Sequence, residues 1–451
     1  MVLQELRVIV GDAHVLVGHD LTAGYATDWT RRFVGHTAAV VRAGSTTEVV
    51  AIVKVCARHG IAIVAQGGNT GMVGGGVAMN EEVTLSLTRM RHIGEVDLAD
   101  RQVTAEAGVT LASLQHAVAS HGLRLGVDIA PRDSCTIGGM VATNAGGSGV
   151  LRHGSMRRQV TGIEAVLGDG SLVTHLHGLV KDNTGYDLAG LLCGSEGTLG
   201  VITRARVALI PAVVDPTTFA LGFTTLEDAI SAANVVRDVL PIEAIEVMFV
   251  NGVALVGDAF GLAVPEVLRS PVSVLVSFPG REIELGDVAP LLSTLSMCAE
   301  PLVADGPWQR RLWEIRERHA EAINTLGPPV KLDVTVPLRT MSAFVESLPS
   351  LVPPTMRTFV FGHLGDGNLH VNVSGVTDES VARSVEDAVL RCVVEHGGSI
   401  SAEHGIGAAK APYLHLCRSP DELALFGRIR QAFDPAGILN PHVLVPLRRR
   451  V

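Results

Sequence analysis

Two histidines stand on either side of a Gly-Asp-Gly turn in the segment FGHLGDGNLHVNV, residues 361–373. These are His363 and His370, and the later segment SAEHGIG, residues 401–407, adds Glu403 and His404. Two histidines and a carboxylate, with coordination positions left for a substrate, suit Zn²⁺ or Mn²⁺ in a catalytic role. On residue types alone, however, histidines that are hydrogen-bonded within the core are the more frequent case. We expect Asp366 to be a turn residue rather than a ligand.

Three segments rich in glycine and small residues form a second group of candidate sites. They are AQGGNTGMVGGG (65–76), SCTIGGMVATNAGGSGVLRHGS (134–155) and KDNTGYDLAGLLCGSEGTLGVIT (181–203). Without Cβ atoms the backbone can curl and direct several N–H groups at one anion, as in a pyrophosphate cradle. None of them is the Rossmann GxGxxG pattern, and the first lacks the lysine of a Walker loop. One such loop alone is weak evidence, but three within one stretch of chain indicate a ligand.

Composition excludes several classes of function. The 451 residues carry a net charge of −10 and no long basic run, which argues against a nucleic-acid partner. The six cysteines are scattered without CxxC spacing, which favours reduced thiols in a cytoplasmic protein. The sequence shows no signal peptide and no apolar run of about 18 residues that could cross a membrane. We therefore expect a cytoplasmic protein, with peripheral attachment to a membrane left open.

The elements that must position these residues alternate along the chain. A strand over 38–43, a capped helix from Ser45 to His59 and a strand over 61–66 precede the first glycine-rich loop. The prolines of 211–216 indicate a linker. Beyond it we expect strands near 218–223, 242–249, 272–278, 331–337, 358–363 and 368–373, with helices near 225–238, 308–325 and 378–396. This pattern predicts an α+β protein of two or three domains.

Taken together, the motifs GGNTG, GGMVATNAGG followed by RHG, KDNTGYDL and GSEGTLG resemble a known flavoprotein family. This is the FAD-binding family of vanillyl-alcohol oxidase and p-cresol methylhydroxylase, and within it the D-2-hydroxyacid dehydrogenase branch. That branch includes D-2-hydroxyglutarate dehydrogenase, D-lactate dehydrogenase and the glycolate oxidase D-subunit. The resemblance runs from about residue 35 to 445. It implies a two-subdomain FAD-binding domain over 1–211, an α+β cap domain for substrate and metal over 212–404, and a helical C-terminal segment over 405–451 that returns to the flavin.

The resemblance also implies which residues bind the cofactors. The residues expected to bind FAD non-covalently are Gly67, Gly68, Asn69, Thr70, Gly71, Gly75, Ser134, Gly138, Gly139, Thr143, Asn144, Gly146, Gly147, Glu196, Gly197, Gly200, Ile202 and Asn440. The metal, Zn²⁺ or Mn²⁺, is expected on His363, His370 and Glu403. On residue types alone, structural histidines were the more frequent case. Because HLGDGNLH and EHG resemble the metal site of this branch, we expect these histidines to be metal ligands instead.

Four further residues match family positions for catalysis and substrate binding. Arg316 and Lys331 are expected to hold substrate carboxylates, Asn372 belongs to the same site, and His404 is the candidate base. Ala320 stands where D-2-hydroxyglutarate dehydrogenases have a threonine, and Phe249 where the family often has an aspartate. Both departures concern the substrate and leave the redox chemistry untouched. Arg318 is expected to form a surface salt bridge.

The resemblance implies an FAD- and metal-dependent dehydrogenase that oxidises a D-2-hydroxy acid to the 2-oxo acid, with D-2-hydroxyglutarate favoured. Oxidation of D-lactate or glycolate is the alternative, and a non-catalytic flavoprotein subunit is a remote one. The sequence shows no iron–sulfur or haem motif, so an external acceptor, an electron-transfer flavoprotein or a quinone, is expected to reoxidise the flavin. A homodimer is compatible with the sequence.

Overall fold

The structure, a computed structural model, describes residues 1–213, 216–279 and 285–445. The chain divides into two compact units. Unit 1 comprises Met1–Gly147, His153–Ala212 and Glu403–Val451, and unit 2 comprises Ser148–Arg152 and Val213–Ala402. Of the expected linker 211–216, residues 214 and 215 lie outside the described residues, as do 446–451 of the expected C-terminal segment.

Unit 1 contains two sheets. The first has the order β1-β2-β4-β3, in which β2, β4 and β3 are parallel and β1 is antiparallel. Its strands are β1 (Val15–Leu16), β2 (Ala39–Arg42), β3 (Ile63–Gln66) and β4 (Val83–Ser86). The helices α1 (Val2–Val10) and α3 (Thr46–His59) pack together beside it. The hydroxyl of Ser45 accepts a hydrogen bond from the backbone of Glu48 and so begins α3, as the sequence predicts.

The second sheet of unit 1 has the order β5-β9-β7-β8, and β6 also pairs with β9. Its strands are β5 (Gln102–Glu106), β6 (Leu123–Leu125), β7 (Val160–Val166), β8 (Leu172–His175) and β9 (Val201–Pro211). The helices of this part are α4 (Leu111–Ala119), α5 (Ile137–Thr143), α7 (Met156–Gln159) and α8 (Leu188–Leu192). Each sheet has its own apolar core, so unit 1 consists of two α+β halves.

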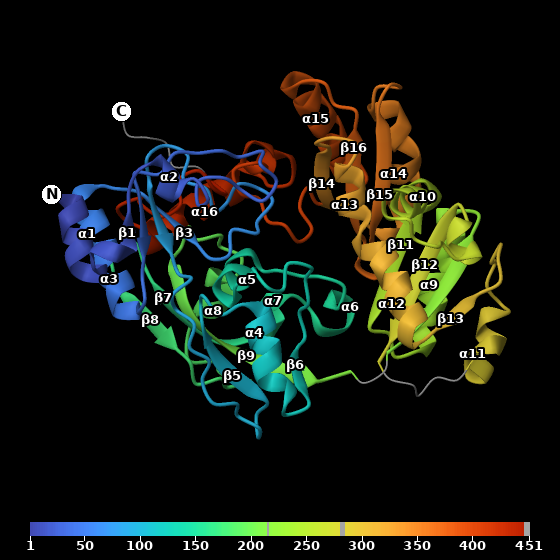
Figure 1. Ribbon diagram of the computed structural model, residues 1–451, viewed down its shortest axis with the longest axis horizontal. Coiled ribbons are helices and arrows are strands. Elements are labelled where there is room, and N and C mark those ends of the chain that lie inside the picture. The colour runs from blue at the N-terminus through green and yellow to red at the C-terminus, as the bar shows by residue number, and fades with distance from the viewer. Residues whose placement is uncertain (214–215, 280–284, 446–451) are drawn as a thin grey trace. The chain divides into compact units, whose positions relative to one another are not determined.

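The C-terminal segment returns to the first sheet of unit 1, as the red end of the ribbon shows in Figure 1. The helix α16 (Pro420–Phe433) begins with a complete capping box between Ser419 and Glu422. After it, the backbone of Leu439 pairs in parallel with Ile63 on β3. The buried guanidinium of Arg430 donates to the carbonyl oxygens of Val443 and Asn440 and so fixes this return.

Unit 2 is built on a seven-stranded antiparallel sheet with the order β13-β10-β12-β11-β15-β16-β14. The strands are β10 (Thr217–Phe223), β11 (Ala244–Phe249), β12 (Val272–Phe278), β13 (Leu302–Ala304), β14 (Val330–Thr335), β15 (Arg357–His363) and β16 (Asn368–Ser374). On β14, Val330, Leu332 and Val334 alternate with Lys331 and Asp333, so the polar pair shares one face of the sheet.

Two groups of helices pack against this sheet. One group consists of α10 (Val250–Phe260), α12 (Gly306–Glu317) and α13 (His319–Asn324), which contact one another and β10, β11, β13 and β15. The other consists of α9 (Leu226–Val239), α14 (Leu338–Leu351) and α15 (Glu379–Glu395), near β10, β12 and β14. The single helix expected near 308–325 is in fact two helices, because the helical backbone is interrupted at Arg318. Arg318 forms the expected salt bridge, to Glu314 at 3.4 Å.

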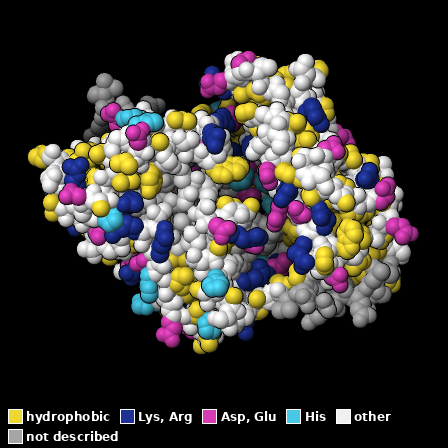
Figure 2. All heavy atoms as spheres, in the orientation of Figure 1, with side chains coloured by type: hydrophobic (Ala, Val, Ile, Leu, Met, Phe, Trp, Pro, Cys, Tyr) yellow, Lys and Arg dark blue, Asp and Glu magenta, His cyan; other side chains and the backbone are white. Residues whose placement is uncertain are grey.

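No helix in the described ranges is long and apolar enough to span a bilayer. On the face drawn in Figure 2, basic and acidic side chains lie interspersed rather than gathered by sign. This face therefore shows no continuous basic patch of the kind that binds nucleic acid.

Candidate active site

Several glycines of the predicted FAD loops allow the loops of unit 1 to approach one another closely. A Cβ on Gly68 would lie 1.7 Å from the carbonyl oxygen of Ser134, and one on Gly67 would lie 2.2 Å from Oγ1 of Thr136. A Cβ on Gly147 would lie 2.1 Å from the carbonyl oxygen of Asp128. A side chain at these positions would clash, and at Gly68 the backbones of the first two glycine-rich segments lie directly against each other.

At other glycines of the same loops a Cβ would meet no close neighbour. A Cβ on Gly71 would meet nothing within 4 Å. One on Gly75 would meet its nearest atom at 3.6 Å, and one on Gly197 at 3.7 Å. Packing within the protein therefore does not exclude a side chain at Gly71 or Gly75, whereas the φ of +75° at Gly197 itself favours glycine. Room beside exposed backbone is what a bound dinucleotide needs, so the loops fit the predicted FAD.

Asn440 and Glu196 join three loops of unit 1. The side-chain amide of Asn440 donates to the carbonyl oxygens of Gly75 and Glu196, at 2.8 Å each. The buried carboxylate of Glu196 accepts from the backbone N–H groups of Ile406 at 2.8 Å and Gly407 at 2.7 Å. Burial raises the pKa of Glu196, although the two N–H donors act in the opposite direction. The GSEGTLG loop is thereby tied to the segment that follows Glu403 and His404.

All the predicted FAD-binding residues belong to unit 1. Asn69, Asn144, Glu196 and Asn440 have positive φ, a conformation that L-residues adopt rarely and that marks tightly determined loops. The side chains of Asn69 and Asn144 bond to protein backbone, at Thr27 and Arg157 respectively. Thr143 lies in α5, and Ile202 is buried on β9. The remaining predicted residues lie on the same loops or on neighbouring elements: Thr70, Ser134, Gly138, Gly139, Gly146 and Gly200.

The predicted metal and substrate residues of unit 2 share one face of its sheet. The register pairs Lys331 with Asn372 and Asp333 with His370 between β14 and β16. Paired residues on adjacent strands point to the same face, as do residues two apart on one strand. His370 also pairs with Phe361 on β15, and their rings are 5.0 Å apart. The antiparallel register therefore brings together residues that are far apart in the sequence.

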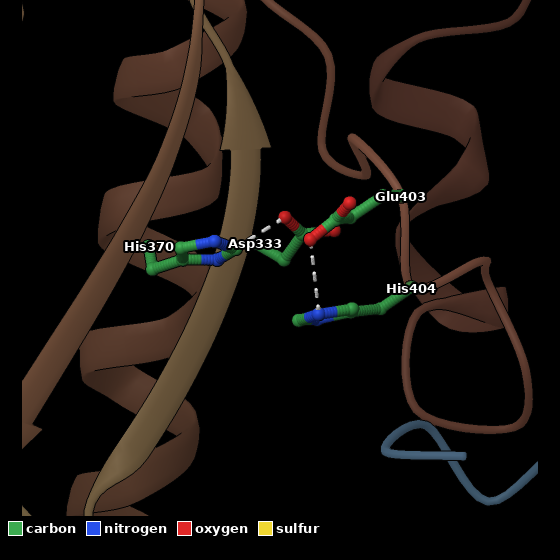
Figure 3. A group of neighbouring side chains, drawn as sticks. All are labelled: Asp333, His370, Glu403 and His404. Atoms are coloured by element: carbon green, nitrogen blue, oxygen red, sulfur yellow. Dashed lines mark ion pairs between the residues drawn. The ribbon is translucent and has the colours of Figure 1, made fainter. Parts of the chain in front are cut away.

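Asp333 and His370 of this face belong to a group of four side chains that could hold a metal ion. Asp333, His370, Glu403 and His404 each offer one ligand atom, and these atoms lie within 4.8 Å of one another. Figure 3 shows Asp333 and His370 directed toward Glu403, with His404 beside it. Glu403 follows Ala402 directly, and the backbone N–H of Ala402 donates to Oδ2 of Asp333 at 3.2 Å. The cluster contains two carboxylates and two imidazoles, a donor set that suits Zn²⁺ or Mn²⁺.

The structure thus assembles His370 and Glu403 of the predicted ligand set and adds Asp333 and the predicted base, His404. His363 lies next to His370, with ring centroids 5.4 Å apart, but is not a member of the four-residue cluster. Nδ1 of His363 faces Oε1 of Glu246 at 2.7 Å. Nδ1 of His370 faces Oδ1 of Asp333 at 3.5 Å. Both histidines therefore have a carboxylate at Nδ1, an arrangement that fixes the ring in metal sites.

Arg316 forms a buried ion pair with Glu246. Nε and Nη2 of Arg316 lie 2.7 Å and 2.6 Å from Oε2 of Glu246, and the guanidinium lies over the ring of Phe361, 4.9 Å from its centroid. Burial alone would raise the pKa of Glu246, but Arg316 and His363 hold it below its usual value. Glu246 is therefore a carboxylate shared by a predicted substrate-binding residue and a predicted metal ligand.

Lys331 and Asn372 are the remaining predicted residues of this face. Lys331 is half-buried, and burial lowers its pKa. Asn372 is buried opposite it on β16. The sequence reasoning missed Asp333 and Glu246. Each is an acidic residue in a strand whose other residues are mostly apolar, KLDVT and IEVMF, and that interruption is the signal that could have identified them.

Comparison with solved structures identifies the fold of the chain. Two solved structures share the fold over nearly the whole chain. p-Cresol methylhydroxylase with substrate bound has a TM-score of 0.79 at 16% identity and is matched over 99% of this chain and 96% of its own. The 4-ethylphenol oxidase of Gulosibacter chungangensis has a TM-score of 0.76 at 20% identity, with 100% and 98% covered. The fold is therefore that of the p-cresol methylhydroxylase-type flavoproteins, as expected.

The sequence comparisons are more specific. Residues 37–175 match the FAD binding domain family, and residues 215–444 match the C-terminal domain of FAD linked oxidases. The mitochondrial D-2-hydroxyglutarate dehydrogenase of Bos taurus is 37% identical, over 93% of this chain and 79% of the bovine one. The D-2-hydroxyglutarate dehydrogenase of Stutzerimonas stutzeri (strain A1501) is 34% identical, over 97% of both chains. The chain belongs to the family of FAD-linked oxidoreductases that includes the D-2-hydroxyglutarate dehydrogenases.

Proposed function

We propose that the chain is an FAD- and metal-dependent dehydrogenase that oxidises a D-2-hydroxy acid to the 2-oxo acid, with D-2-hydroxyglutarate the favoured substrate. The observation that carries the proposal is the possible metal-binding group of Asp333, His370, Glu403 and His404, of which Asp333 and His370 share a face of the sheet of unit 2 with Lys331. Relatives that are 33–37% identical bear the name D-2-hydroxyglutarate dehydrogenase, which supports this substrate. An external electron-transfer flavoprotein or quinone would accept the electrons.

FAD, held by the glycine-rich loops of unit 1, would supply the acceptor for the hydride that leaves C2 of the substrate. A Zn²⁺ or Mn²⁺ ion held by His363, His370 and Glu403 would supply a Lewis acid for the 2-hydroxyl group. Asp333 is a further candidate ligand, because its carboxylate belongs to the same cluster. The reaction removes one hydride from carbon and one proton from oxygen, so the protein must also provide a base.

His404 is the proposed base. An imidazole nitrogen can accept a proton from a hydroxyl group within hydrogen-bond reach, and the ring of His404 belongs to the cluster, with Nε2 3.7 Å from Oε1 of Glu403. It would take the proton of the 2-hydroxyl group as the hydride leaves carbon.

Lys331, Asn372 and Arg316 are proposed to hold the carboxylates of the substrate. Lys331 offers a half-buried ammonium group, and Asn372 an amide beside it on β16. Nε and Nη2 of Arg316 already donate to Glu246, which leaves Nη1 for the substrate. Fixing both ends of a dicarboxylate would orient C2 as well as increase affinity.

One observation favours a second candidate, the oxidation of D-lactate or glycolate. The charge of Arg316 is already balanced by the buried carboxylate of Glu246, so a distal substrate carboxylate is less needed to neutralise it. Ala320, packed against the cluster of Ile323, Phe359 and Phe361, adds an apolar surface where D-2-hydroxyglutarate dehydrogenases have a threonine. Both features suit a monocarboxylate better than a dicarboxylate.

Steady-state kinetics with an artificial electron acceptor distinguish the candidates. We expect D-2-hydroxyglutarate to have a higher kcat/KM than D-malate, D-lactate and D-2-hydroxybutyrate. Lys331→Met should reduce that preference, because a site built for a polar group rejects analogues that lack it by up to about 10⁴-fold. If D-lactate is the best substrate and Lys331→Met leaves the ranking unchanged, the dicarboxylate assignment is wrong.

A further inference from the structure

Glu246 is an acidic residue in the middle of unit 2. It is 1% exposed and lies on β11 between the apolar residues Ile245 and Val247. Burying a carboxylate is costly unless it is paired and hydrogen-bonded, so a role must offset the cost. We propose that Glu246 is a positioning residue that orients His363 for metal binding and at the same time fixes Arg316. This inference rests on the metal site of the proposed function.

The two oxygens of Glu246 serve different partners. Oε1 lies 2.7 Å from Nδ1 of His363, and Oε2 lies 2.7 Å and 2.6 Å from Nε and Nη2 of Arg316. A carboxylate paired with arginine is ionised and can only accept hydrogen bonds. Nδ1 of His363 must therefore donate, which makes Nε2 the nitrogen of a neutral ring that is able to bind a metal. The carboxylate thus sets both the orientation and the tautomer of the imidazole.

The register of the sheet makes this contact rigid. Glu246 pairs directly with His363 across β11 and β15, so both side chains emerge on the same face at fixed separation. Arg316 approaches from α12, and its guanidinium is held over the ring of Phe361. Phe361 also packs against His370. A change at Glu246 should therefore affect both His363 and Arg316, although Glu246 itself touches no substrate.

His370 has the same kind of partner. Its Nδ1 faces Oδ1 of Asp333 at 3.5 Å, and Asp333 pairs with it across β14 and β16. Each histidine of the predicted metal site is thus accompanied by an acidic residue at the directly opposite position on a neighbouring strand. The repetition of this arrangement on two pairs of strands indicates that the acidic residues serve the imidazoles. Glu246 differs from Asp333 in that its second oxygen also fixes Arg316.

The test is a titration of FAD-loaded, metal-stripped protein with Mn²⁺. The EPR signal of the free ion measures how much Mn²⁺ remains unbound. Glu246→Gln removes the charge at nearly constant volume and should raise the Mn²⁺ dissociation constant by about 10–100-fold, the usual effect of losing such a partner. Glu246→Asp keeps the charge but withdraws it by one methylene group, so its affinity should lie between those of Glu246→Gln and the wild type. The ratio of FAD to protein should be unchanged in both variants, because unit 1 holds the flavin.

Glu243→Gln is the matched control. Glu243 lies just before β11 in the same unit and also pairs with an arginine, Arg152, at 3.6 Å. This variant should bind Mn²⁺ like the wild type. If the wild type binds Mn²⁺ and both Glu246 variants bind it equally well, the inference is wrong while the metal site stands. If the wild type itself binds no Mn²⁺ or Zn²⁺, the metal site and the inference both fail.

Discussion

The amide of Asn440 bridges the carbonyl oxygens of Gly75 and Glu196, at 2.8 Å each, and so joins the C-terminal segment to two glycine-rich loops. Asn440→Ala would leave both carbonyl groups without this donor, and an unsatisfied buried group costs about 1–3 kcal/mol. We expect the FAD dissociation constant to rise by about tenfold or more. The ratio of FAD to protein after gel filtration measures the effect. Asn234→Ala in α9 is the control, and equal FAD loss in both variants would contradict the prediction.

Two glycines of the first loop should respond differently to substitution. A Cβ on Gly75 would meet its nearest atom at 3.6 Å, an ordinary contact distance, so Gly75→Arg should leave the fold intact but occupy the expected FAD site and abolish FAD retention. Gly68 lies against Ser134, so even Gly68→Ala should lower the melting temperature of the apoprotein. Circular dichroism melting and flavin absorbance separate the two effects. A Gly75→Arg protein that retains FAD at the wild-type ratio would exclude this loop from the cofactor site.

Removal of the metal should abolish activity without removing FAD. The metal-ligand cluster and the FAD loops share no residue, although the backbone N–H of Gly147 donates to Oε2 of Glu403 at 2.7 Å, so EDTA treatment should abolish turnover while FAD stays bound. Added Zn²⁺ or Mn²⁺ should restore the activity. His370→Ala should behave like the chelated enzyme. Full turnover of a protein shown to be metal-free would make the histidines structural.

His319 should make unit 2 sensitive to mild acid. Burial lowers the pKa of this histidine to about 3, and the nearby charge of Arg316 acts in the same direction. The unfolded chain binds a proton below about pH 6.5, whereas the folded chain does not, so stability is lost as the pH falls from 6.5 toward 3. The slope from this group approaches about 1.4 kcal/mol per pH unit.

His319→Gln keeps a side-chain donor for the carbonyl oxygen of Ile315 but cannot titrate. Comparing urea unfolding at pH 7 and pH 5 tests the prediction, since the wild type should lose more stability than the variant over this interval. An equal loss in both proteins would show that His319 does not contribute to the acid sensitivity.

Sequence patterns a few residues long were enough to predict those helix starts, strands and turns that are determined by residues close together in the chain. The cap at Ser45, the strand before Gly67 and the turn at Asp366 are set within a few residues, and the structure has them where expected. The helix α10 was not predicted, and its sequence VNGVALVGDAF contains two glycines, Gly252 and Gly257, which lower the helix propensity of the segment. The break at Arg318 depends on how α12 and α13 pack, which the sequence pattern does not show.

The acidic partners of His363 and His370 could not be predicted from local sequence, for a different reason. Glu246 and His363 are 117 residues apart, and only the pairing of β11 with β15 makes them neighbours. Asp333 and His370 likewise meet through the register of β14 and β16. A shift of one residue in either pairing would turn these acids to the other face of the sheet. The sequence indicates which residues could carry the chemistry, whereas long-range register decides which of them meet.

The most direct test of the proposed function is anaerobic mixing of the metal-loaded, FAD-containing protein with D-2-hydroxyglutarate. The visible absorbance of the oxidised flavin should disappear within the time of turnover, and 2-oxoglutarate should form in a one-to-one ratio with the FAD reduced. L-2-hydroxyglutarate and the EDTA-treated protein should give no bleaching. A flavin that stays oxidised with every D-2-hydroxy acid, while a chemical reductant bleaches it, would contradict the assignment of this chain as a D-2-hydroxyacid dehydrogenase.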